Sequence, residues 1–248
     1  MAQKRALIPN TFTMSNMVFG FIAIIFASKG DPVSIGIAGV LIFVASFFDF
    51  LDGTTARALH VSSPIGVQLD SLADEIAYGI APGFLAYQVY FKDLPEMGLG
   101  LNWGMIIAPI FPICATYRLA KFNVTGFDKS GFTGLPSPVA GIFIASLTVL
   151  QMSQLSKIVF LGNISFNLSP KLFVLLYAFI ALLMISEIDY SKLVSEIIKK
   201  GKKVILIAVV AVILLLFYLQ MWAVFICTGL YILFGIGRFL FRLVYKRK

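Results

Sequence analysis

Apolar runs recur along almost the whole chain, and each is long enough to cross a membrane as a helix. In lipid, only helices and closed barrels satisfy every backbone polar group, and the alternating ten-residue segments of a barrel do not occur in this sequence. The sequence therefore predicts an all-α, polytopic transmembrane helical bundle of about eight spans. Their approximate bounds are Thr11–Ala27, Val33–Asp49, Gln68–Tyr90, Trp103–Ala120, Pro138–Leu155, Pro170–Ile185, Val204–Leu219 and Trp222–Leu240.

Composition supports a membrane protein: 59% of residues are hydrophobic and only 13% are charged, against about half and a quarter in soluble domains. The basic start at Lys4 and Arg5 is followed by no small-residue cleavage site, so we interpret the first span as an uncleaved anchor. The cysteines, Cys114 and Cys227, lie far apart in apolar runs. We therefore expect them to pack rather than to form a metal site or disulfide framework.

The distribution of positive charge predicts the orientation of the bundle. With the N-terminus inside the cell, sixteen of the 20 lysines and arginines fall in the inside segments and four fall outside. Because short cytoplasmic loops carry an excess of these residues, we expect both termini to be cytoplasmic. The same bias explains the net charge of +8 without a nucleic-acid partner.

We expect three regions: a transmembrane domain over residues 1–186, a basic cytoplasmic connector over 187–203, and an additional C-terminal part over 204–248. The connector is either an amphipathic segment against anionic headgroups or a solvated linker. The last two spans form one apolar stretch. A turn near Gln220 would make a helical hairpin, and a single long tilted helix is the alternative.

Four aspartates lie in the stretch "DFLDGTTARALHVSSPIGVQLDSLAD", at the predicted inside ends of the second and third spans. Asp49 and Asp52 are three residues apart, and Asp70 and Asp74 are four apart, so each pair shares a helix face. The intervening "HVSSPIG" contains Pro64, which disfavours helix before it. We therefore predict a hairpin that brings two acidic faces together.

Converging carboxylates repel one another unless cations lie among them, and hard oxygen ligands suit Mg²⁺, Mn²⁺ or Ca²⁺. The acidic hairpin therefore indicates a two-metal site for a phosphate-bearing substrate. Gly53 and Ala56 leave space beside the backbone for a nucleotide or pyrophosphate. Arg57 adds a planar cation suited to phosphate.

The spacing D-x2-D-G-x2-A-R-x8-G-x3-D-x3-D resembles the signature of the CDP-alcohol phosphatidyltransferases without departure. The resemblance implies a six-span core over about residues 8–186, a homodimer, and two divalent cations held by the four aspartates, with Asp74 also the general base. It also implies a pocket for the CDP-linked lipid. The residues implied for this pocket are Asn10, Thr13, Gly53, Ala56, Arg57, Ser63 and Gly66.

The acceptor is indicated by "YRLAKFN" and "GFTGLPSPVAG", which resemble elements of the membrane-embedded phosphatidylserine synthases within this family. A zwitterionic acceptor such as L-serine has a carboxylate that Arg118 could bind bidentately. By this resemblance Lys121 and Asn123 join Arg118 in the acceptor pocket. Alternatively, Arg118 and Lys121 are only the positive charges that flank a membrane span on its cytoplasmic side.

The sequence thus predicts transfer of a phosphatidyl group from CDP-diacylglycerol to L-serine at the inner face of the cell membrane, with Mg²⁺ or Mn²⁺. Glycerol 3-phosphate or an inositol phosphate as acceptor, and CDP-archaeol as donor, remain open. A different class, a divalent cation transporter, would also place carboxylates in a membrane protein. Its acids would more often lie near the midplane within inverted repeats, which this sequence does not contain.

Overall fold

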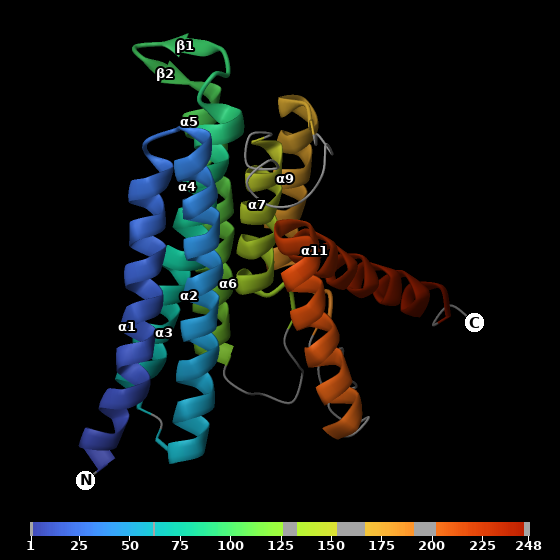
Figure 1. The fold of residues 1–248 in the computed structure, drawn as a ribbon. Helices are drawn as coiled ribbons and strands as arrows, with labels where there is room; N and C mark the ends of the chain where they lie inside the picture. Colours follow the sequence, from blue (N-terminus) through green and yellow to red (C-terminus); the bar gives the residue numbers. More distant parts are fainter. Residues whose placement is uncertain (1, 62, 126–132, 153–166, 191–201, 246–248) are drawn as a thin grey trace.

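The computed structural model describes residues 2–61, 63–125, 133–152, 167–190 and 202–245, with side chains for all of these except 2–6, 125 and 202–220. The described part is an all-α bundle with one small β-hairpin (Figure 1). The elements are α1 (Ala2–Ala27), α2 (Pro32–Leu59), α3 (Pro64–Asp74), η1 (Glu75–Ile80), α4 (Ala81–Ala86), η2 (Tyr87–Phe91), β1 (Glu96–Gly98), β2 (Leu101–Asn102), α5 (Trp103–Ile107), α6 (Ile110–Thr125), α7 (Ser137–Gln151), α9 (Pro170–Ile185) and α11 (Lys202–Tyr245).

Within these residues, four helical stretches are long and apolar enough to cross a membrane, which confirms an integral membrane protein. They are Leu7–Ala27, Pro32–Leu59, Trp103–Val124 and Met221–Tyr245. The helices α7 and α9 are shorter and equally apolar. The cytoplasmic position of the two termini, which charge counting predicts, stays a prediction.

The helices that carry the aspartates extend beyond the predicted spans. α2 continues ten residues past Asp49, to Leu59, and His60 ends it in the left-handed conformation with φ 51°. After Val61 and a single undescribed residue, the Ser63 side chain caps α3 by accepting a hydrogen bond from the Gly66 amide at 3.0 Å. The predicted break within "HVSSPIG" is therefore confirmed.

From Pro64 to Phe91 the chain is helical throughout, but two of its stretches, η1 and η2, are π-helical. η1 begins directly after Asp74. Single π-helical turns inside α-helices occur frequently at functional sites, because the wider turn changes the direction in which the following side chains point. The predicted third span is thus one helix whose side-chain register shifts beside the aspartates.

The helices α1, α2, η1 and α4 pack around a core made mostly of alanine residues. A Cβ atom at Gly20 in α1 would lie 2.8 Å from the Cα of Ala77 in η1, so this glycine permits backbone contact between the two helices. A second core joins η2, α6, α7 and α9, and Tyr90 stacks on Phe173 there at 3.6 Å between ring centroids. The β1–β2 hairpin lies at the end of the bundle opposite the α2–α3 turn (Figure 1).

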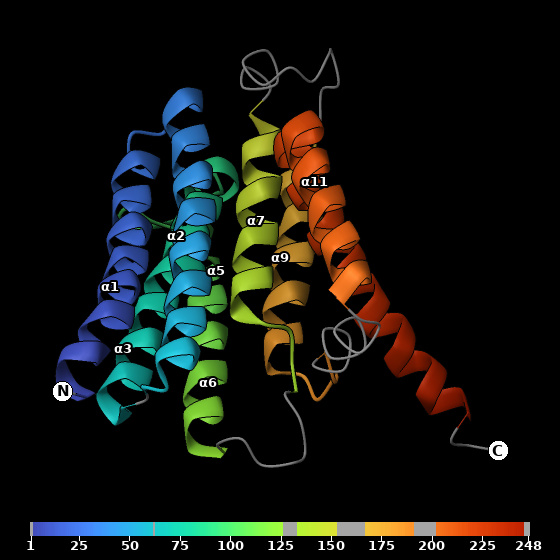
Figure 2. The same ribbon diagram turned by 60° about the horizontal axis from the view of Figure 1, so that its bottom comes forward.

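The C-terminal region differs from the prediction in one respect, the helical structure of its turn. α11 is helical from Lys202 to Tyr245, and Gln220 lies within it, so no loop separates the last two apolar runs. Figures 1 and 2 show α11 as two arms that point in different directions, and the helix therefore changes course without leaving helical structure. The physical reason is that the residues around Gln220 include no proline or glycine to end a helix. Of the predicted connector, residues 191–201 lie outside the described part.

Candidate active site

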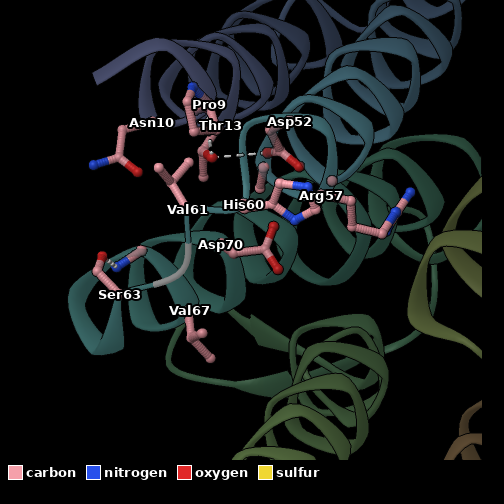
Figure 3. A pocket seen from close by; sticks show the side chains of 13 residues that line it. Pro9, Asn10, Thr13, Asp52, Arg57, His60, Val61, Ser63, Val67 and Asp70 are labelled. Carbon is pink, nitrogen blue, oxygen red and sulfur yellow. Dashed lines mark hydrogen bonds between the residues drawn. The ribbon is translucent and has the colours of Figure 1, made fainter. Parts of the chain in front are cut away.

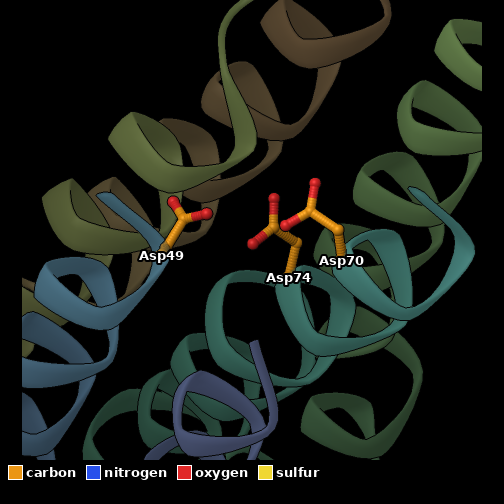
Figure 4. A group of neighbouring side chains, drawn as sticks. All are labelled: Asp49, Asp70 and Asp74. Atoms are coloured by element: carbon orange, nitrogen blue, oxygen red, sulfur yellow. The ribbon is translucent and has the colours of Figure 1, made fainter. Parts of the chain in front are cut away.

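Three of the four aspartates converge at one end of the bundle. One carboxylate oxygen from each of Asp49, Asp70 and Asp74 lies within 4.8 Å of the other two. Asp49 comes from α2, whereas Asp70 and Asp74 come from successive turns of α3, and Figure 4 shows the three carboxylates facing one another. The α2–α3 hairpin therefore does bring the two acidic faces together, as the spacing predicts.

This cluster fits a divalent cation by its chemistry. Asp74 is 92% buried, and one oxygen of Asp70 is buried without a hydrogen-bond partner among the described residues. Carboxylates held this close out of water repel one another, and a bound cation removes that repulsion. The donors are all oxygens, which suits Mg²⁺, Mn²⁺ or Ca²⁺ rather than a soft metal.

Asp52 lies beside this group rather than within it. Its buried carboxylate accepts a hydrogen bond from the Thr13 hydroxyl of α1 at 2.8 Å. The fourth predicted ligand is thus held in place by a neighbouring helix. Its side chain faces the adjoining pocket, where Figure 3 shows the Thr13–Asp52 hydrogen bond.

Two further side chains hold the carboxylates, and sequence reasoning missed both. The fully buried Asn16 donates to Asp74 at 3.2 Å, and the Tyr78 hydroxyl donates to Asp49 at 3.4 Å. The spacing of three between Asn10, Thr13 and Asn16 places them on one face of α1, and this signal could have found Asn16. Tyr78 had no comparable signal, because its direction depends on the π-helical turn.

A pocket of about 440 Å³ opens next to the carboxylates, between α1, the end of α2 and the start of α3 (Figure 3). All seven residues predicted to bind the CDP-linked lipid line it, together with Asp52 and Asp70. Gly66 is needed there for space, since a Cβ atom would lie 3.1 Å from the Ser63 hydroxyl and 3.4 Å from the Asn10 side chain. The structure adds four lining residues that sequence reasoning did not assign to the pocket: Pro9, His60, Val61 and Val67.

The residues predicted for the acceptor do not form one group. Arg118 is largely buried and donates to the fully buried Ser137 hydroxyl at 3.0 Å. Its guanidinium also interacts electrostatically with Asp74. Its Nε atom is buried without a hydrogen-bond partner among the described residues. Lys121 is exposed. Asn123 instead joins α6 to α3, donating to the Ser71 hydroxyl at 2.9 Å.

A helical membrane bundle with a carboxylate cluster beside a pocket defines a membrane protein with a candidate metal centre. The family model for CDP-alcohol phosphatidyltransferase matches residues 6–169, which contain the whole cluster and pocket. The chain belongs to the CDP-alcohol phosphatidyltransferase family. The helices α9 and α11 lie beyond the matched residues.

Curated relatives carry one printed name, CDP-diacylglycerol–serine O-phosphatidyltransferase. The chain is 33% identical to the protein of that name from Helicobacter pylori over 244 residues, covering 96% of this chain and 93% of the relative. It is 29% identical to the Methanocaldococcus jannaschii protein, covering 96% of each chain. The Bacillus subtilis relative is 36% identical over 141 residues, or 57% of this chain and 75% of the relative.

Proposed function

We propose that this protein transfers the phosphatidyl group of CDP-diacylglycerol to the hydroxyl of L-serine, forming phosphatidylserine and CMP. The observation that carries the proposal is the convergence of Asp49, Asp70 and Asp74 beside the 440 Å³ pocket, with the buried Arg118 close to Asp74. The printed names of the relatives support serine as the acceptor.

The donor binds in the pocket between α1, α2 and α3. Arg57 offers its guanidinium to the phosphates, and Gly53 and Ala56 let the nucleotide approach the helix backbone. Ser63 and Gly66 form the opposite edge, where the cap of α3 fixes the backbone. Asn10 and Thr13 close the pocket from α1.

The four aspartates would hold two divalent cations, Mg²⁺ or Mn²⁺. When bound, the cations neutralise the charge that develops on the pyrophosphate during transfer. The part of this chain is to fix the ligands beforehand. Asn16 holds Asp74, Tyr78 holds Asp49 and Thr13 holds Asp52, so little rearrangement is needed at the moment of reaction.

Asp74 acts as the general base. Its carboxylate takes the proton of the serine hydroxyl while the serine oxygen attacks the phosphorus nearer the lipid. The new P–O bond forms as the bond to the CMP oxygen breaks, and CMP leaves with that electron pair. Asn16 keeps the Asp74 carboxylate in one orientation, which is what an efficient proton transfer requires.

Arg118 binds the serine carboxylate. Its buried guanidinium has a donor to spare and lies on the Asp74 side of α6, so the serine hydroxyl can approach the base. Lys121 and Asn123 complete the acceptor side in this proposal. The exposed Lys121 supplies a cation at the entrance to the acceptor site, and Asn123 supports α3 through its hydrogen bond to Ser71. Glycerol 3-phosphate or an inositol phosphate would call for more cations than Arg118 and Lys121 supply.

The enzyme works as a multi-pass protein of the cytoplasmic membrane, with the site on the cytoplasmic face. Membrane lipids surround it and supply the donor. A homodimer, which the family resemblance implies, belongs to the same proposal. Spheroplast proteolysis or cysteine labelling at Leu99, the fully exposed tip of the β1–β2 hairpin, reports the side on which that end of the bundle lies.

The test is conversion of labelled L-serine into a lipid by the purified protein in vesicles that contain CDP-diacylglycerol and Mn²⁺ or Mg²⁺. We expect labelled phosphatidylserine, none in EDTA, and no lipid product from glycerol 3-phosphate or inositol phosphate. A lipid product from one of those acceptors instead of serine would support the phosphatidyl transfer and contradict serine as the acceptor.

The runner-up is divalent cation transport through the carboxylate cluster. Uptake of radiolabelled Mn²⁺ into sealed vesicles without any CDP-lipid, together with no lipid product from any acceptor, would favour it. Lipid synthesis without Mn²⁺ uptake excludes it.

A further inference from the structure

We propose that the C-terminal helix α11 completes the acceptor side of the site, with Tyr231 as a positioning residue for Arg118. This inference rests on the proposed function and assigns a role to a helix that the family model does not cover. It concerns the binding of the acceptor alone, since none of the residues of α11 whose side chains are described, 221–245, lines the pocket beside Asp52 and Asp70.

Tyr231 of α11 belongs to the polar surroundings of Arg118. The guanidinium of Arg118 interacts electrostatically with both Asp74 and the Tyr231 hydroxyl. The Tyr231 oxygen is a polar group that can stabilise this cation in an apolar setting.

The position of Tyr231 is itself fixed by Tyr190. The two rings stack with centroids 5.6 Å apart, and the Tyr231 hydroxyl donates to the Tyr190 carbonyl at 3.4 Å. Tyr190 is 99% buried. The hydroxyl of Tyr231 is thus held in one direction.

A second line of contacts joins the same segment to the hydrogen-bond partner of Arg118. The amide of Gly134 donates to the Ile188 carbonyl at 2.8 Å, and the amide of Leu135 donates to the Leu183 carbonyl at 2.9 Å. These bonds fix the backbone directly before Ser137, whose hydroxyl accepts from Arg118. Residues 183–190 therefore contact both Tyr231 and the backbone that leads to Ser137.

Close packing of α11 on this segment depends on Gly235. A Cβ atom at Gly235 would lie 2.1 Å from the Tyr190 ring, which no side chain tolerates without movement. Two residues on, a Cβ atom at Gly237 would meet nothing within 4 Å. An alanine at Gly235 would therefore clash with Tyr190, whereas an alanine at Gly237, on the same helix, would not.

The first test is Tyr231→Phe, which keeps the stacked ring and removes the hydroxyl that donates to the Tyr190 carbonyl and interacts electrostatically with Arg118. We expect the KM for serine to rise about fivefold, as for one lost neutral hydrogen bond, with kcat and the KM for CDP-diacylglycerol within about twofold of the parent. The control is Tyr245→Phe, the same change at an exposed position of α11. An unchanged serine KM, or an equal rise in both KM values, would overturn the proposal.

The second test compares Gly235→Ala with Gly237→Ala, each checked for intact folding by thermal unfolding. Gly235→Ala should raise the serine KM and leave binding of CDP-diacylglycerol intact, whereas Gly237→Ala should match the parent. Should Gly235→Ala fail to fold, Tyr231→Phe alone decides. If the parent uses serine and the Tyr231→Phe variant behaves as the parent does, this inference is wrong and the proposed function stands. A parent that makes no lipid from serine removes the proposed function as well.

Discussion

The two sides of the site are built in different ways. The carboxylate side comes from α1, α2, α3 and η1, within the first 78 residues, and each acid there has a named partner or lies against the other acids. The Arg118 side is assembled from four separate segments: α6, the start of α7, the stretch after α9, and α11. The first side is local in sequence and the second is not.

This difference suggests which side is free to vary. A two-metal carboxylate centre demands fixed ligand positions, and a hairpin of two consecutive helices supplies them with few long-range contacts. An acceptor pocket assembled from distant segments can change its shape by small shifts of one segment. We expect changes on the carboxylate side to stop the chemistry and changes on the Arg118 side to alter acceptor affinity.

The largest effect is expected for Asp74→Asn, which keeps the shape of the side chain and removes the proposed base. CMP release should fall about 10³-fold or more, because general base catalysis contributes on that order, while CDP-diacylglycerol should still bind. Asp31→Asn is the matched control, since Asp31 caps the far end of α2 and asparagine caps almost as well. Loss of CDP-diacylglycerol binding in a folded Asp74→Asn protein would contradict the role of base.

Metal binding should appear as a gain in stability. Mn²⁺ or Mg²⁺ at about 100 times its Kd should stabilise the fold by about 2.7 kcal/mol, measured as a rise in Tm over the EDTA-treated protein. Asp49→Asn and Asp70→Asn should lose most of that rise, whereas Asp93→Asn, an exposed acid near the β1–β2 hairpin, should keep it. An equal rise in all of these proteins would indicate cation binding elsewhere.

A smaller effect is expected on the donor pocket from Thr13→Val, which leaves the buried Asp52 carboxylate without its hydroxyl donor. We expect about a tenfold loss in kcat/KM for CDP-diacylglycerol, as for one hydrogen bond to a charged group. Thr11→Val is the control, because the Thr11 hydroxyl bonds only to its own helix. Equal losses in both variants would show an effect on α1 as a whole rather than on Asp52.

The smallest effect is expected for Ser137→Ala, which removes the hydroxyl that Arg118 donates to. The KM for serine should rise about fivefold, less than the full value of a hydrogen bond to a charged group, because a water molecule can accept from the freed Arg118 donor, and the KM for CDP-diacylglycerol should not change. Ser146→Ala provides the comparison, since Ser146 is equally buried in α7 but bonds only to a carbonyl of its own helix. A serine KM that does not move would place Ser137 outside the acceptor side.

The sequence predicted the carboxylate side well for a physical reason. Helical spacing places Asp49 and Asp52, and Asp70 and Asp74, on faces that a short turn can bring together. The pocket residues came from the family resemblance, and Asn10 and Thr13 lie outside the hairpin, on α1. Asp52 and Asp49 nevertheless have separate surroundings, because the Thr13 hydroxyl of another helix engages only Asp52.

The Arg118 side could not be predicted to the same depth. Arg118 and Lys121 share a helix face by spacing, yet one is buried against α7 and the other is exposed, which only tertiary packing decides. Tyr231 lies more than a hundred residues from Arg118 in the chain and is reached through Tyr190. The predicted turn near Gln220 is not a loop but a change of direction inside α11, which a uniformly apolar run does not distinguish from a loop. That the two arms form a hairpin of two membrane spans stays a prediction.

The division between the two sides is tested most directly by initial rates over a full matrix of serine and CDP-diacylglycerol concentrations, for the parent and for Arg118→Ala. The account predicts a rise in the serine KM of about a hundredfold, as for a lost charge-assisted pair, with the KM for CDP-diacylglycerol within about twofold. An equal rise in both constants, or a loss of kcat alone, would contradict it and remove Arg118 from the acceptor side.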